Sequence, residues 1–200
     1  MVPRTVAELT ISSPDGLNTR QLQGCARLIF NAGRGYYDLI EADRDLVERQ
    51  IAKQVGQRGT ELERVFIVLI ESEVAGLHAC VSTEVLPYVM MEGTLRLLRG
   101  FDRGAQKDFL ARLERARPSL PTLPEKSLYL ARMAVADSFG GCGVARALME
   151  DFFGHRSFET SYCLHCLTDN TSALNFYQRL GFRQFGDEKA GFRAMFRSAA

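Results

Sequence analysis

Three glycines stand directly in front of a helical pattern, in the stretch SFGGCGVARALM of residues 138–149. The start of a helix exposes unpaired backbone N–H groups and carries about half a positive charge, so it attracts anions such as phosphate. Gly140, Gly141 and Gly143 would let an anion approach those amides without meeting a Cβ atom. The stretch therefore indicates a phosphate-binding turn. Its simpler interpretation is a tight strand-to-helix turn with no ligand, because glycine also favours positive φ.

Two common phosphate-binding patterns do not fit this turn. A P-loop needs a lysine followed by serine or threonine after the last glycine, and Val144-Ala145-Arg146 stands there instead. A dinucleotide fingerprint needs glycine or alanine at the position of Arg146. It also usually needs an acidic residue at the end of the next strand, where Leu167-Thr168 stands.

The C-terminal half of the chain resembles the GNAT superfamily of N-acetyltransferases in two motifs. The turn from Gly140 to Ala145 matches the family's Gln/Arg-x-x-Gly-x-Gly/Ala loop except at its first position, where Gly140 replaces Gln or Arg. The second motif, N-x-x-A-x-x-F-Y-x-x-x-G-F, runs from Asn170 to Phe182. Two motifs in the right order are more specific than either alone, and the resemblance covers about residues 127–182.

The resemblance implies acetyl-CoA as the cofactor, with coenzyme A as the product. In this family the strand ending at Val135 splays from the strand ending near Leu167, and pantetheine enters the gap. Backbone groups of Met133 and Val135 would bind its amides as an added strand would. The cofactor-binding residues implied are Met133, Ala134, Val135, Gly140, Gly141, Cys142, Gly143, Val144, Ala145, Asn170, Ala173, Phe176 and Tyr177.

The resemblance also implies that Tyr177 is the catalytic acid, placed near the thioester sulfur. A tyrosine with a pKa near about 10 stays protonated at neutral pH and can protonate a departing thiolate. The alternative is that its ring simply belongs to the core. Asn170 would touch the cofactor or serve only as a helix N-cap. Arg146 would neutralise a phosphate or lie solvated on an exposed helix face.

The base that would deprotonate the amine is not evident. Many family members place a carboxylate on the strand that corresponds to residues 127–135. Strict alternation puts Tyr129, Ala131 and Met133 on one face here, and Leu130, Arg132 and Ala134 on the other. Neither face offers a carboxylate. The remaining candidates are Glu84, Glu125, His78, His165 and a chain of water molecules.

Composition limits the class of protein and its partners. At 200 residues and 46% hydrophobic content, the chain suits one domain over residues 1–200. A net charge of +1 gives no reason to expect nucleic acid or an anionic membrane as a partner. The N-terminus lacks a secretory pattern and no apolar run is long enough to span a membrane, which favours a cytoplasmic protein.

The cysteine pattern does not favour a metal or redox site. Five scattered cysteines suit reduced, buried thiols better than a disulfide framework. Cys163-x-x-Cys166 lies in a predicted strand, where a separation of three residues points the two thiols to opposite faces. No second pair or histidine cluster supports a metal, so we expect none.

Hydrophobic patterns predict an α/β (α+β) domain with a mixed, mostly antiparallel sheet of six to seven strands, flanked by helices and splayed at its centre. The predicted strands are Val6–Ser12, Arg64–Ile70, Val74–Thr83, Ser127–Val135, Tyr162–Leu167 and Gly191–Phe196. The predicted helices are 18–33, 46–55, a helical insertion at about 91–117 interrupted near Gly100–Gly104, 143–153 and 171–180.

The function that follows is N-acetyl transfer from acetyl-CoA to a primary amine of a small molecule or peptide, by direct attack in a ternary complex. A covalent relay through Cys142 is less attractive, because that thiol would face the phosphates. The alternative function is a non-catalytic acyl-CoA-binding sensor or interaction module. Tyr36, Tyr37 and the insertion at 91–117 would shape the acceptor site, and the insertion could instead form a homodimer surface.

Overall fold

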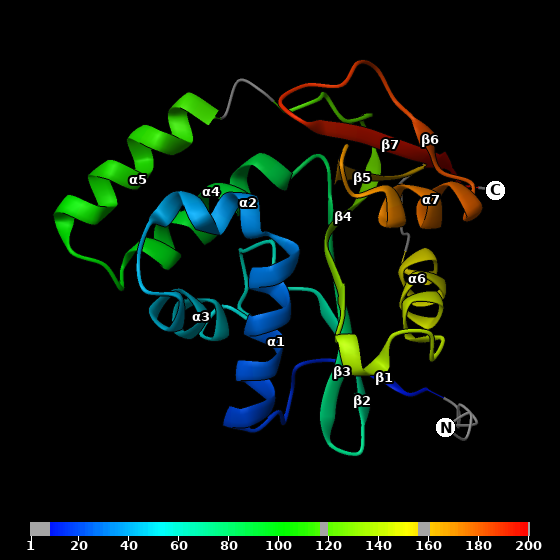
Figure 1. The fold of residues 1–200 in the computed structure, drawn as a ribbon, viewed down its shortest axis with the longest axis horizontal. Helices are drawn as coiled ribbons and strands as arrows, with labels where there is room; N and C mark the ends of the chain where they lie inside the picture. The colour runs from blue at the N-terminus through cyan, green and yellow to red at the C-terminus, as the bar shows by residue number, and fades with distance from the viewer. Residues whose placement is uncertain (1–8, 117–119, 156–160, 200) are drawn as a thin grey trace.

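The computed structural model describes residues 9–116, 120–155 and 161–199, and its centre is a seven-stranded sheet with the order β1-β2-β3-β4-β5-β7-β6 (Figure 1). The strands are β1 (Ile11–Ser12), β2 (Val65–Ile70), β3 (Glu73–Ser82), β4 (Ser127–Val135), β5 (Ser161–Leu167), β6 (Arg183–Gln184) and β7 (Phe192–Ser198). The helices are α1 (Thr19–Ala32), α2 (Arg34–Tyr37), α3 (Arg44–Ala52), α4 (Leu86–Leu98), α5 (Arg103–Ala116), α6 (Val144–Gly154) and α7 (Thr171–Arg179), with short 3-10 turns η1 (Asp38–Ile40) and η3 (Asp137–Phe139).

The sheet is splayed at its centre. Its paired neighbours run antiparallel except β4 and β5, which run parallel. These two strands pair only from Ser127 to Tyr129 and from Ser161 to Cys163, although β4 continues to Val135 and β5 to Leu167. The predicted mixed sheet with separating central strands is therefore confirmed. We call the region between the unpaired parts of β4 and β5 the β4–β5 gap.

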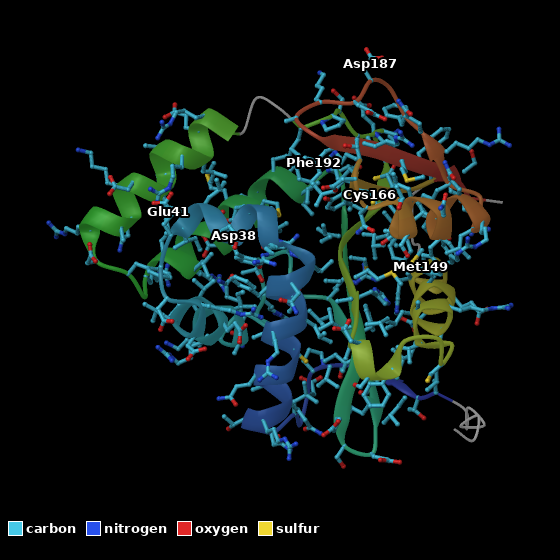
Figure 2. The ribbon with its side chains drawn as sticks, in the orientation of Figure 1. Asp38, Glu41, Met149, Cys166, Asp187 and Phe192 are labelled. Carbon is cyan, nitrogen blue, oxygen red and sulfur yellow. The ribbon has the colours of Figure 1, made fainter. Side chains whose placement is uncertain are left out.

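Helices cover both faces of the sheet. In Figure 1, α1 to α5 lie on one side of β3 and β4, while α6 and α7 lie on the other. The first face buries a core that includes Ile29 of α1 and Leu97 of α4. On the second face, Met149 of α6 and Cys166 of β5 belong to a second cluster, and both are labelled in Figure 2. We refer to these as the α1 face and the α6 face.

Local sequence signals explain where α1 begins and ends. The Asn18 side chain accepts a hydrogen bond from the Gln21 amide, and the Gln21 side chain accepts one from the Asn18 amide, which forms a capping box. Gly33 ends the helix and its amide bonds back to Ile29 and Phe30. The predicted helix is confirmed at both ends.

The helical insertion starts earlier than its predicted start at residue 91. Leu86 opens α4 with a proline in its first turn, where the missing amide costs no hydrogen bond. The break falls at residues 99–102, and Asp102 then accepts hydrogen bonds from the amides of Gly104 and Ala105 at the start of α5. The end of the predicted insertion, residue 117, lies outside the described residues.

The first strand and the segment after α1 also differ from the prediction. The first strand comprises only Ile11–Ser12, and residues 6–8 of its predicted range lie outside the described residues. Tyr36 and Tyr37, which lie between the predicted helices 18–33 and 46–55, belong to the short helix α2. Tyr37 stacks on Phe30 at a centroid distance of 5.6 Å, so packing against α1 holds this turn helical.

A single arginine ties α5 to the rest of the α1 face. The Arg112 guanidinium donates to the carbonyl oxygens of Leu39 at 2.6 Å and Ile40 at 3.2 Å, and it also pairs with Glu41 at 3.0 Å. Figure 2 labels Glu41 beside α5. Two of these acceptors are backbone carbonyl groups. The position of α5 therefore depends on the backbone of η1 as well as on the Glu41 side chain.

A β-bulge in β4 overturns the predicted assignment of faces. Ala79 pairs with Arg132 and Cys80 pairs with Leu130, so Ala131 has no partner on β3. The extra residue shifts the alternation by one. Arg132 therefore lies with Ala131 on the α1 face, over the Tyr37 ring, while Met133 packs on the α6 face. Strict alternation had placed both residues on the opposite faces.

In the part of the chain that the structure describes, no helix combines the length and the apolar character needed to cross a membrane.

Candidate active site

The glycine turn before α6 presents free backbone amides to open space. Gly141 and Gly143 adopt positive φ values of 75° and 80°, and Gly143 is the N-cap of α6 without a side-chain cap. A Cβ atom built on either glycine would meet nothing within 4 Å. Within the described residues, the amides of Gly141, Gly143, Val144 and Ala145 donate to no backbone carbonyl of the turn. The turn thus has the donors and the space that an anion requires.

Gly140 differs from its neighbours. Its φ is −57° and its amide donates to the carbonyl oxygen of Asp137 at 3.1 Å. Any residue can adopt this backbone conformation, so the φ value of Gly140 does not require glycine. An added Cβ would lie 3.3 Å from that same carbonyl oxygen, which is a tight contact.

Close packing on β3 fixes the position of α6. Gly76 has no side chain, and a Cβ there would lie 2.8 Å from Cγ1 of Val144, the first residue of α6. Val144 and Leu148 are buried against Val68 and Ala75 of the sheet. The start of α6 therefore rests directly on the sheet, because β3 carries glycine at the point of contact.

The backbone of β4 turns polar groups toward the β4–β5 gap. The Ala136 amide donates to the Ala75 carbonyl oxygen at 2.9 Å, so Ala136 is bonded toward β3. In an antiparallel pair such residues alternate with residues whose polar groups face the other way. Met133 and Val135 thus direct their N–H and C=O groups away from β3, toward the gap. Ala134 directs its own toward β3.

Tyr177 of α7 reaches β4 across this gap. Its hydroxyl donates to Sδ of Met133 at 3.7 Å, and its ring packs edge-on against Phe176 and Phe182. Burial raises the pKa of Tyr177 well above its usual value near about 10. The hydroxyl is therefore protonated throughout the neutral range.

Asn170 caps the helix that carries Tyr177. Its Oδ1 accepts a hydrogen bond from the Ala173 amide at 3.1 Å. The N-cap interpretation of Asn170 is confirmed, and the side-chain Nδ2 group is left over for another partner. Ala173 and Phe176 pack beside the second core cluster, so the helix face next to them is held against β5 and β7.

On the α1 face a second pair lies where the gap begins. The Tyr129 hydroxyl lies 3.3 Å from Nδ1 of His165, and Nε2 of His165 lies 2.8 Å from the Pro121 carbonyl oxygen. Burial lowers the pKa of His165, with the hydrogen bond to Pro121 acting in the opposite direction. Burial also raises the pKa of Tyr129 to about 12.

A buried carboxylate that sequence reasoning missed lies beside the bulge. Glu61 and Arg132 are 5% and 9% exposed, and their side chains approach to 3.5 Å. Nη1 of Arg132 also donates to the carbonyl oxygen of the bulged Ala131 at 2.7 Å. No local signal predicts this pair, because Glu61 lies in the connection between α3 and β2. Burial raises the pKa of Glu61, although Arg132 acts in the opposite direction.

A second missed cluster ties α6 to β3. Nε2 of His78 and Nε2 of His155 lie 2.7 and 2.8 Å from the same Oδ2 of Asp151. The three ligand atoms lie within 4.8 Å of one another, which makes this the group among the described residues that could hold a metal ion. Each imidazole already uses its Nε2 atom on the one carboxylate oxygen. We therefore interpret the cluster as a hydrogen-bonded clamp between the helix and the sheet.

The other predicted candidates lie apart from the gap or on the surface. Glu84 and Glu125 are exposed. Arg146 is exposed and pairs with Glu150 at 2.8 Å on its own helix. Cys142 is half-buried in the turn, while Cys163 and Cys166 are buried free thiols. Cys166 belongs to the cluster of the α6 face.

The C-terminal part of the chain matches a known domain. Residues 108–184 match the family model described as "Acetyltransferase (GNAT) domain", a range that runs from α5 to β6 and includes both motifs. A search of curated proteins finds no match.

Solved structures share the fold at low sequence identity. An N-acetyltransferase from Staphylococcus aureus Mu50 is 16% identical, with a TM-score of 0.69 over 94% of this chain and 99% of that one. A Bacillus subtilis acetyltransferase in complex with CoA is 12% identical, with a TM-score of 0.54 over 96% and 99%. The ribosomal-protein-S18-alanine N-acetyltransferase from Escherichia coli is 16% identical, with a TM-score of 0.51 over 96% and 94%.

The seven-stranded sheet, splayed between β4 and β5 and flanked by helices, is the GNAT acetyltransferase fold. The resemblance to the GNAT superfamily, predicted from the glycine turn and the motif from Asn170 to Phe182, is confirmed.

Proposed function

We propose that this protein is an acetyl-CoA-dependent N-acetyltransferase that acts on the primary amine of a small molecule or peptide in a ternary complex. The observation that supports this function best is the convergence of two strand-to-helix junctions on one gap. The first supplies the open amides of the glycine turn before α6. The second supplies the Tyr177 hydroxyl beside Met133.

The glycine turn suits the pyrophosphate of acetyl-CoA. Its free amides at Gly141, Gly143, Val144 and Ala145 would donate to phosphate oxygens, aided by the positive end of the α6 dipole. The absence of Cβ atoms at Gly141 and Gly143 leaves that approach open. Gly140 and Cys142 would border the phosphates through their backbone.

The pantetheine arm would lie in the β4–β5 gap. The backbone groups of Met133 and Val135 face the gap and would bind its amides as an added strand does. Ala134 lies between these two residues and directs its backbone polar groups toward β3. It would therefore contact the arm without a backbone hydrogen bond. Nδ2 of Asn170, with Ala173 and Phe176 behind it on α7, would border the arm from the other side.

Tyr177 would act as the general acid. Bound acetyl-CoA supplies an activated thioester carbonyl and a thiolate leaving group. Because burial keeps the Tyr177 hydroxyl protonated, it can donate its proton to a sulfur atom that becomes negative. The Tyr177 hydroxyl already donates to one sulfur atom at the gap, which is Sδ of Met133.

The acceptor would approach from the α1 face. The Tyr36 hydroxyl is bonded to Thr94 at 2.7 Å and Tyr37 is buried against Phe30, so these two rings brace α2 against α1 and α4. Because Tyr36 and Tyr37 hold α2 in place, they would set the shape of the entrance for the acceptor.

Calorimetric titration with acetyl-CoA tests the cofactor. We expect saturable binding of acetyl-CoA and of coenzyme A, and much weaker binding of NAD, whose nicotinamide half cannot enter the gap as an extended strand. A folded protein that takes up no acetyl-CoA at millimolar concentration would refute the proposal.

A non-catalytic acyl-CoA-binding module is the second candidate. Two observations favour it: Gly140 stands where the family places Gln or Arg, and β4 carries no carboxylate in its nine residues. A panel of small amines and peptides, assayed for thiol release from acetyl-CoA, separates the two functions. Turnover on any amine supports the enzyme, while tight acetyl-CoA binding without turnover across the panel supports the module.

A further inference from the structure

Tyr129 and His165 contact each other at the start of the gap, on the face opposite Tyr177. Tyr129 is the last residue of β4 that pairs with β5, and His165 lies two residues beyond Cys163, its pairing partner. The Tyr129 hydroxyl, 3.3 Å from Nδ1 of His165, therefore lies where the two strands begin to separate. The Tyr177 hydroxyl contacts Met133 from the α6 face, while the Tyr129 hydroxyl contacts His165 on the α1 face.

The hydrogen bonds define the state of the imidazole. The Pro121 carbonyl oxygen can only accept, so Nε2 of His165 carries a proton and donates to it at 2.8 Å. In the neutral ring Nδ1 then holds a lone pair, and the Tyr129 hydroxyl donates to it. If Nδ1 gains a proton, it can donate to the Tyr129 oxygen instead. Both charge states of His165 are therefore fully hydrogen-bonded.

We propose that Tyr129 and His165 form the proton-accepting relay for the acceptor amine, with Tyr129 contacting the ammonium group and His165 receiving the proton through it. This inference rests on the proposed function, because it assigns the base of that same reaction.

The proton movements balance. The ammonium nitrogen gives a proton to the Tyr129 oxygen as Tyr129 passes its own proton to Nδ1 of His165, so the products are a neutral amine and an imidazolium. The amine lone pair then forms the C–N bond, the C–S bond breaks, and the electron pair leaves on sulfur, which takes a proton from Tyr177. Tyr177 is reprotonated as the new amide nitrogen loses its second proton, and His165 returns its proton to solvent.

The surroundings fit a relay that starts uncharged. The groups that act on Tyr129 are Arg132, which lowers its pKa, and Cys163 and Glu61, which raise it. The Pro121 carbonyl faces His165 from the preceding segment. Arg193 on β7 and Asp169 after β5 act on the adjacent Cys166.

The other buried bases point elsewhere. A Cβ atom built on Gly93 of α4 would collide with Oε2 of Glu61, so that carboxylate faces α4. His78 faces α6, where it bonds to Asp151. Among the candidates that the sequence left open, His165 is the one that the fold places at the gap.

Kinetics as a function of pH test the relay, using the amine that the thiol-release panel identifies. Tyr129→Phe and His165→Gln should lower kcat by about 100-fold at pH 7 and change the acetyl-CoA dissociation constant by less than about twofold. The loss should shrink as pH rises toward the pKa of the amine, because a free amine needs no base. A loss that is equal at all pH values, or a wild-type pH profile in both variants, would overturn the relay.

Two matched variants control for structural damage. Tyr162→Phe removes another buried hydroxyl, which donates to the Phe153 carbonyl oxygen at 2.7 Å on the same sheet. His155→Gln removes a histidine outside the gap. Both should keep the wild-type pH profile, and a profile altered as in His165→Gln would count against the relay.

Nitrogen NMR of the imidazoles in the wild-type protein gives a readout that needs no turnover. We expect a neutral His165 with the proton on Nε2 at pH 7, and an Nδ1 resonance that shifts in Tyr129→Phe. A proton on Nδ1, or an imidazolium at pH 7, would overturn the relay even if acetyl-CoA binds. Absence of acetyl-CoA binding would refute the proposed function instead, so the two failures are distinguishable.

Discussion

Tyr177 and Met133 meet across the β4–β5 gap, where the hydroxyl of one lies 3.7 Å from the sulfur of the other. Tyr177 comes from α7 and Met133 from the residue after the bulged part of β4. The contact depends on the bulge, because strict alternation would turn the Met133 side chain to the α1 face. One inserted residue in a strand thus places a sulfur-directed hydroxyl at the gap.

Replacing Tyr177 with phenylalanine should reduce kcat by about 100-fold, because the departing thiolate loses its proton donor. Acetyl-CoA affinity should change by less than about twofold, since the ring and its packing remain. Steady-state kinetics and calorimetry measure the two quantities. Tyr162→Phe is the matched control, and an equal effect of both variants on kcat would contradict the assignment of Tyr177 as acid.

Replacing Gly143 with alanine should destabilise the protein by about 1 kcal/mol, because its φ of 80° strains any residue with a Cβ. The new methyl group would also occupy the open side of the turn, so acetyl-CoA affinity should fall. Gly154→Ala, at the other end of α6 with open space around it and no positive φ, should instead stabilise by about 0.5–1 kcal/mol. Urea unfolding and calorimetry measure both effects, and unchanged affinity in Gly143→Ala would argue against phosphate binding at this turn.

Replacing Asp151 with asparagine should destabilise the protein at neutral pH by about 2 kcal/mol, because two histidines lose a charged acceptor. Burial raises the pKa of Asp151, but the hydrogen bonds from His78 and His155 outweigh it, so the pKa lies below its usual value. A lowered carboxyl pKa stabilises the folded state above the unfolded value of about 3.9, and this contribution disappears as pH falls through the folded value.

The difference between Asp151→Asn and wild type should therefore be constant above about pH 5 and shrink at lower pH. Thermal unfolding from pH 3 to pH 8 measures it, with Asp187→Asn as an exposed control. A difference that grows on acidification would contradict the clamp.

Removing either partner of the Glu61–Arg132 pair should cost about 3–5 kcal/mol, because a buried charge is left without its counterion. The double variant Glu61→Gln with Arg132→Met should recover most of that loss. Chemical unfolding of the two single variants and the double variant gives the coupling free energy. Additive losses would show that the two charges act independently.

Local signals were sufficient for many elements of this fold. The predicted strand Ser127–Val135 is confirmed to the residue, since a run rich in apolar residues lies there between Lys126 and Asp137. Asn18 and Gly33 mark the ends of α1 because capping depends on residues within one turn. The glycine turn and Tyr177 were identified from neighbours in the sequence, and the roles proposed for them await the experiments above.

Contacts between distant segments could not be predicted in the same way. The bulge at Ala131 arises from how β4 pairs with β3, and a period of two gives no sign of it. Glu61 reaches Arg132, and Asp151 reaches His78, only because packing brings separate elements together. The sequence by itself determined the elements and the residues at their ends, because those depend on interactions within a few residues. Only the tertiary structure decided which buried charges meet and which hydroxyls border the gap, because sheet register and helix packing set those distances.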